Sequence, residues 1–72
     1  MKIKPTPHYR RYHANKIAWS LVVKVIFACK HKRVGKEYFT YIDKTPKQKV
    51  YVFGKYDKKE DTFWVINAKK ER

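Results

Sequence analysis

The chain has 72 residues, with 19 Lys and Arg against six Asp and Glu, and its formal net charge is +13. This length excludes more than one sizeable domain, and a hydrophobic content of 43% excludes a wholly disordered protein. The single cysteine, Cys29, excludes an internal disulfide and favours a reducing, cytoplasmic setting. The apolar stretch 17–29 is interrupted by Lys24 and is too short to span a bilayer, so we expect no membrane association.

The positive charge is unevenly distributed along the chain. Residues 1–36 contain ten Lys and Arg and no acid, whereas residues 37–72 contain nine Lys and Arg and all six acids. Like charges at this density repel one another, and a polyanion neutralises them. Twelve aromatic residues, two Trp, six Tyr and four Phe, add flat rings that can stack on bases. The combination predicts a nucleic-acid partner, either DNA or RNA.

Residues 1–14 are predicted to form a flexible basic and aromatic arm. Pro5 and Pro7 break regular structure, and no apolar periodicity begins before Ile17. Such arms often become ordered only on binding. Within this one, two arginines are candidates for phosphate contacts and two tyrosines for base stacking: Arg10, Arg11, Tyr9 and Tyr12.

Residues 16–30 fit both a strand and a helix. The odd positions from Ile17 to Cys29 are all apolar, which is the period-2 pattern of a half-buried strand, and β-branched residues are frequent. A helical stripe through Leu21, Val22 and Val25 leaves Trp19, Val23, Ile26 and Phe27 on other faces. The pattern therefore favours a long first strand, with one helix over residues 16–31 as the alternative.

The rest of the chain predicts a basic turn followed by three strands. The turn covers residues 31–36, and the strands cover residues 37–42, 49–53 with 56 as an alternative end, and 62–68, joined by short polar connections. The expected fold is mainly β: one domain over residues 15–69 with a frayed tail at 70–72, built as a four-stranded antiparallel sheet that is curled or barrel-like. The alternative is an α+β domain, one helix packed on a three-stranded antiparallel meander.

The predicted binding site combines an exposed sheet face with the basic turn. If Val50 and Val52 are buried, Tyr51 and Phe53 point outward and can stack on bases, and neighbouring strands would add Phe39 and Tyr41, or Trp64. The phosphate contacts predicted in the turn and directly before it are Lys30, Lys32, Arg33 and Lys36. The expected function is nucleic-acid binding through phosphate contacts and stacking, with weak sequence specificity.

Other interpretations of the same residues stay open. The second sheet face can be covered by another segment or by a second copy, so the protein is expected to be a monomer or an edge-strand homodimer. The charge can also serve an acidic protein partner, for which this chain would be an inhibitor or adaptor.

His8, His13 and His31 supply residue types used by small metal-independent ribonucleases, but nothing in the sequence positions them, and an enzyme is not the favoured interpretation. The spacing of these histidines and Cys29 does not match structural zinc motifs, and no metal or cofactor is expected. A short basic chain without recognisable motifs would also suit a phage or mobile-element protein.

Overall fold

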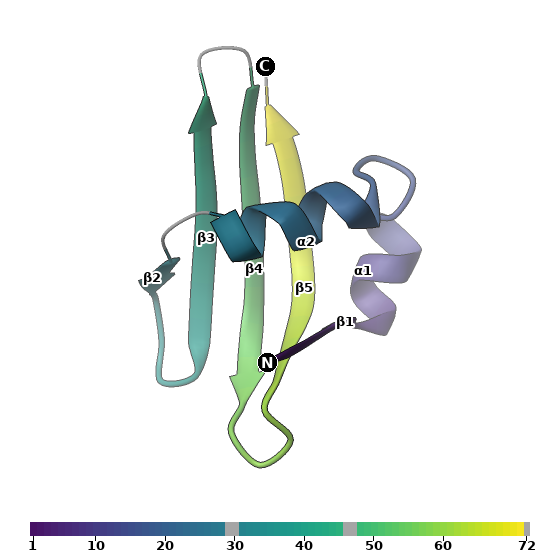
Figure 1. Cartoon of the computed structure of the whole chain (residues 1–72). Coiled ribbons are helices and arrows are strands. Elements are labelled where there is room, and N and C mark those ends of the chain that lie inside the picture. Colours follow the sequence, from purple (N-terminus) through teal and green to yellow (C-terminus); the bar gives the residue numbers. More distant parts are fainter. Residues whose placement is uncertain (29–30, 46–47, 72) are drawn as a thin grey trace.

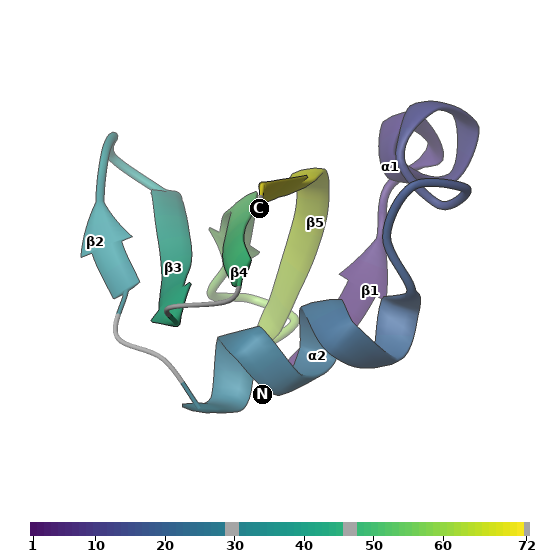
Figure 2. The ribbon, with the colours of Figure 1, turned by 90° about the horizontal axis from the view of Figure 1, so that it is seen from above.

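The computed structural model of the chain describes residues 1–28, 31–45 and 48–71, and it shows a mainly β fold. Five strands form one open sheet in the order β1-β5-β4-β3-β2, with two helices outside it (Figures 1 and 2). The strands are β1 (Lys2–Pro5), β2 (His31–Arg33), β3 (Tyr38–Thr45), β4 (Gln48–Asp57) and β5 (Thr62–Glu71). The helices are α1 (Pro7–Tyr12) and α2 (Trp19–Ala28). β1 runs parallel to β5, and the other neighbours are antiparallel.

The mainly β prediction is confirmed, but the predicted four strands and their all-antiparallel pairing are wrong, and the sheet is not a closed barrel. The sheet has five strands and is mixed rather than antiparallel, and it does not close, because β1 and β2 are its two edges. The three later strands lie where they were predicted and are longer. β5 includes the predicted frayed residues Lys70 and Glu71, which pair with Val50 and Lys49 of β4.

The prediction of a strand over residues 16–30 is wrong, because most of this segment is helix α2. Val22, Val25 and Ile26 lie on one stripe of the helix and are at most 4% exposed, whereas Phe27 is 68% exposed. Intrinsic propensity disfavours a β-branched helix by only tenths of a kcal/mol per residue. Burying each of these side chains is worth about 1.5–3 kcal/mol, so packing against the sheet decides the structure. Cys29 and Lys30 lie outside the described residues.

α2 crosses one face of the sheet and forms the core with it (Figure 2). The inward residues of the three long strands alternate with outward ones, and a bulge between β4 and β5 keeps the pattern in step. Phe53 pairs with Asn67 while the next residue, Gly54, pairs with Val65, so Ile66 has no partner in β4. A Cβ at Gly54 would lie 2.3 Å from the Trp64 carbonyl oxygen, so the backbone approach here requires glycine. The buried hydrophobic residues of the sheet are Tyr41, Val50, Val52, Phe63, Val65 and Ala68.

Residues 1–14 are not a flexible arm. Thr6 caps α1, because its Oγ1 accepts a hydrogen bond from the Tyr9 backbone N–H, and the same hydroxyl donates to the Val65 carbonyl at 2.7 Å. Pro7, a strand breaker in the sequence, occupies the first turn of α1, where its missing N–H costs nothing. Tyr9 is only 2% exposed, and its hydroxyl donates to the Ile17 carbonyl at 2.8 Å. The N-terminal segment is therefore part of the core.

Replacing Tyr9 with Phe should lower the free energy of unfolding by about 1–2 kcal/mol, because the Ile17 carbonyl would lose its partner in a buried position. Urea unfolding followed by circular dichroism measures the difference. Tyr12→Phe is the matched control, since Tyr12 is 55% exposed on the same helix and its substitution should stay within about 0.5 kcal/mol of wild type. Equal effects of the two substitutions would show that α1 is not part of the cooperative unit.

Asp61 fastens β1 to the β4–β5 turn. Its carboxylate accepts a hydrogen bond from the Tyr56 hydroxyl and lies 3.3 Å from the amino-terminal nitrogen of Met1, and its carbonyl accepts from the Lys2 N–H at 2.9 Å. Asp61 also has a φ of 49°, which Asp and Asn tolerate better than most residues. The hydrogen bond from Tyr56, followed by the contact with the amino terminus, lowers the pKa of the Asp61 carboxyl.

Asp61→Asn should therefore destabilise the fold near neutral pH, and the difference from wild type should shrink as the pH falls. The folded state binds the proton of the Asp61 carboxyl less tightly than the unfolded state does. The stabilisation is therefore present above the ordinary carboxyl pKa of about 4, and it is lost as the pH falls through the lower pKa of the folded state. Urea unfolding at a series of pH values measures it, with Glu60→Gln as a neighbouring carboxylate control. A difference that does not change with pH would contradict this role of the carboxylate.

Candidate nucleic-acid interface

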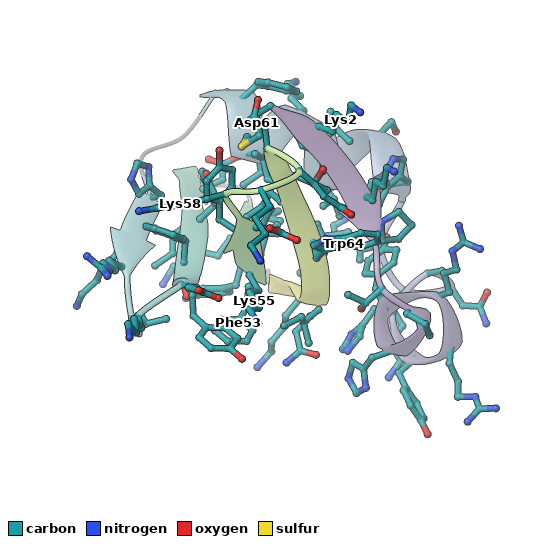
Figure 3. All side chains as sticks on the ribbon, turned by 90° about the horizontal axis from the view of Figure 1, so that it is seen from below. Lys2, Phe53, Lys55, Lys58, Asp61 and Trp64 are labelled. Atoms are coloured by element: carbon teal, nitrogen blue, oxygen red, sulfur yellow. The ribbon has the colours of Figure 1, made fainter. Side chains whose placement is uncertain are left out.

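The sheet has a second face that α2 does not cover. Figure 2 shows α2 on one side of the strands, with α1 beyond the β1 edge and displaced towards the other side. Within the described ranges 1–28, 31–45 and 48–71, no helix or strand lies across this second face, which we call the open face. Figure 3 shows Phe53 and Lys55 projecting from β4 on the side away from α2, with Trp64 on the neighbouring strand. The side chains of this face are therefore available to a partner.

One row of the open face alternates aromatic rings with lysines. Tyr38 of β3 pairs with Lys55 of β4, Lys55 pairs with Trp64 of β5, and Trp64 pairs with Lys4 of β1. Since neighbouring strands lie about 4.8 Å apart, the row spans roughly 14 Å. The Lys4 Nζ lies 5.7 Å from the ring centroid of Trp64, and the Lys55 Nζ lies 6.0 Å from that of Tyr38. Each ring of the row thus has an ammonium group within cation–π range.

A third ring, that of Phe53, lies against this row. The rings of Tyr38 and Phe53 are 5.6 Å apart between centroids and only 2° from parallel, and Tyr38 is 37% exposed. Phe53 pairs with Asn67, and two residues earlier in β4 Tyr51 pairs with Lys69. The half-buried rings of Tyr51, Phe53 and Trp64 are held by the sheet and still reach the surface. This gives the open face rigid flat surfaces rather than mobile side chains.

Lysines give the open face a positive charge. Lys4, Lys49, Lys55 and Lys69 are exposed residues of β1, β4 and β5 that share this face by register, and Lys32 joins them from β2. The Glu37 carboxylate lies 3.4 Å from the Lys55 Nζ, but both side chains are about half exposed, so the pair is weak. The charge of this face therefore remains largely positive.

The structure separates the predicted stacking residues into two groups. Tyr51 and Phe53 lie on the open face, opposite in direction to the buried Val50 and Val52, so their predicted orientation is confirmed. Tyr9 is buried and cannot stack on a base, whereas Tyr12 is exposed on α1. The prediction left Trp64 as an alternative to two residues of β3, Phe39 and Tyr41. These two share the α2 side of the sheet, where Tyr41 packs edge-to-face on Phe63 and burial raises the pKa of its hydroxyl.

The predicted phosphate contacts lie at the two opposite edges of the sheet, near β1 and near β2. Arg10 and Arg11 are exposed on α1, beyond the β1 edge. Lys32 lies in β2 and Lys36 in the β2–β3 turn, at the other edge. Arg33 donates to the carbonyls of Gly35 and Lys36 at 3.1 and 2.6 Å, so it stabilises the turn. Lys30 lies outside the described residues.

Sequence reasoning missed one ring and four lysines of the open face, namely Tyr38, Lys4, Lys49, Lys55 and Lys69. Lys55 follows Phe53 by two positions, so the alternation in β4 was a usable signal. Placing Tyr38 on the open face requires the register of β3 with β4, and placing Lys4 there requires that β1 be recognised as a strand. These pairings depend on hydrogen bonds between distant segments, which no local pattern displays.

The histidines do not meet in one site. His8 and His13 lie on and after α1, with ring centroids 5.2 Å apart. His31 lies on β2 at the opposite edge of the sheet, packed near the rings of Phe39 and Tyr41. Among the described residues, no group of three His, Cys, Asp or Glu could hold a metal ion. Neither of the two helices described has the length and apolar character that a membrane span requires.

Comparisons with known proteins do not assign the chain to a family: no family model, no curated protein and no solved structure matches it. The function must therefore be argued from the open face itself.

Replacing both Tyr38 and Phe53 with Leu should reveal the coupling of the stacked pair. In a double-mutant cycle of urea unfolding free energies, the interaction energy should be about 0.5–1.5 kcal/mol in favour of the native pair. The control pair is Phe53 with Tyr51, which lies two residues earlier in the same strand. Additive effects of the Tyr38 and Phe53 substitutions would contradict a packed ring pair on this face.

Proposed function

We propose that the protein binds single-stranded nucleic acid on the open face, by stacking bases on its rings and pairing phosphates with its lysines. The observation that carries the proposal is the row Tyr38, Lys55, Trp64, Lys4, in which rings and ammonium groups alternate across four strands. Aromatic side chains on an exposed sheet are a common platform for unpaired bases.

The rings favour an unpaired strand over a duplex. In a duplex the base faces are stacked on one another, so Trp64 and Phe53 could reach only backbone and groove edges. In a single strand each base has a free face, and stacking contributes about 1–3 kcal/mol per base. Rings that the sheet already holds in place lose little conformational freedom on binding.

The charges favour a polyanion over a second copy of the chain. Two copies meeting through their open faces would bring the lysines of both together, and each chain already carries a net charge of +13. A nucleic-acid backbone would instead neutralise the lysines and release its counterions. Arg10 and Arg11 on α1 and Lys32 and Lys36 at the β2 edge would extend the contact on either side.

Binding should have weak sequence preference. Lysines act as point charges and rings stack on any base, so neither supplies the paired donors and acceptors that distinguish one base from another. Asn67 contributes an exposed amide beside Phe53, but one amide cannot specify a sequence.

Trp64→Ala should weaken binding to single-stranded DNA or RNA by about 5- to 150-fold, which is the loss of one stacking contact. Fluorescence anisotropy with labelled single-stranded and duplex oligonucleotides, at ~50 mM and ~200 mM salt, measures the affinity and its salt dependence. Wild type should prefer the single strand, and affinity should fall steeply with salt. Trp64→Phe should retain much of the binding because it keeps a ring.

Phe27→Ala is the matched control, since Phe27 is 68% exposed on α2, on the covered side of the sheet. It should leave binding unchanged, and circular dichroism of each variant should show the native fold. Absence of binding to any oligonucleotide at ~50 mM salt would overturn the proposal and leave an acidic protein as the partner to seek. Equal losses in the Trp64 and Phe27 variants would place the site elsewhere.

A further inference from the structure

A basic groove lies beside the part of β5 that has a neighbouring strand, β4, on one edge only. β1 ends at Pro5, so it pairs with β5 only as far as Val65, whereas β5 continues to Glu71. The loop between α1 and α2 lies beside the remaining edge of β5, at the end of the molecule opposite the β4–β5 turn (Figure 1). Between them is a groove of about 380 Å³. Its lining residues are His13, Lys16, Ala68, Lys69 and Lys70.

The lining of this groove is suited to an anion. Three of its five lining residues are lysines and a fourth is a histidine, and none of the five is acidic. The volume is within the range of small-molecule sites, so a phosphate with an attached sugar can enter. A phosphate monoester carries about −1.5 to −2 charges near neutral pH, roughly twice the charge of a diester within a strand. The groove is thus better matched to a terminal or free phosphate than to an internal one.

The backbone of the loop and the ring of His13 are held in place before any ligand arrives. The backbone N–H groups of Lys16 and Ile17 both donate to the His13 carbonyl, at 3.0 and 3.1 Å. The His13 ring stacks on the buried Tyr9, with centroids 6.2 Å apart and planes 21° from parallel, and His8 lies against it. A ligand would therefore meet a largely formed site, which lowers the entropic cost of binding.

We propose that this groove binds a phosphate monoester, carried either by the end of a nucleic-acid strand or by a free nucleotide. The site goes beyond the function proposed for the open face and does not require it. The two are close enough to act together, because Lys69 lines the groove and also pairs with Tyr51 of the open face. A strand that ends in the groove would continue onto the rings.

Two pairs of probes test the proposal by 1H–15N correlation spectra and anisotropy. One pair is adenosine 5′-monophosphate and adenosine, and the other is a short oligonucleotide with and without a terminal phosphate at either end. The phosphorylated member should shift the amide signals of Lys16, Ala68 and Lys70, and a terminal phosphate should raise oligonucleotide affinity about tenfold. A response to the nucleotide alone assigns the site to a free ligand, and a response to the oligonucleotide end assigns it to strand ends.

The variant Lys16→Gln/Lys70→Gln should abolish these shifts and the gain from a terminal phosphate. The matched control is Lys58→Gln/Lys59→Gln, which removes the same charge from the β4–β5 turn at the other end of the molecule. Equal losses in both double variants, or no groove shifts with any phosphorylated probe, would overturn the proposal. These experiments distinguish failure of the groove proposal from failure of the function proposed for the open face. If only the open face does not bind, Trp64→Ala would leave oligonucleotide affinity unchanged while the nucleotide still shifts the groove signals.

Discussion

Burial of a single sheet face under one helix is the constraint on which the rest of this structure depends. A chain of 72 residues buries only about 60% of its unfolded surface, and here the core is one layer between α2 and the inward side chains of β3, β4 and β5. No second apolar layer remains for the other face among the described residues. That face must therefore tolerate water, and its amphipathic rings and lysines do so.

The N-terminal segment makes this thin core large enough. Thr6 and Tyr9 bring α1 onto the edge of β5 and the start of α2, and Ile17 is buried beside them. The same contacts hold the backbone that carries Arg10, Arg11 and Lys16. Because Tyr9 lies under His13 and its hydroxyl binds the Ile17 carbonyl, packing in the core also shapes the basic groove.

Charge and shape lead to the same class of partner. The open face and the groove both combine positive charge with a rigid support, and they adjoin one another at Lys69. Stacking surfaces beside a site for a phosphate group correspond to the two chemical parts of a nucleotide, the base and its phosphate. The proposed partner, a single-stranded nucleic acid, would satisfy both surfaces and offset the repulsion among the 19 Lys and Arg of the chain.

The sequence by itself determined the mainly β class, the three long strands and the outward direction of Tyr51 and Phe53, because alternation at period 2 is a local property. The tertiary structure alone decided that residues 19–28 are a helix, because burying its apolar side chains against one face of the sheet outweighed their β propensity. It also decided that Tyr9 lies in the core while Tyr38, Lys4 and Lys55 join the open face. Those placements depend on the parallel pairing of β1 with β5 and on the register of β3 with β4, which join residues far apart along the chain.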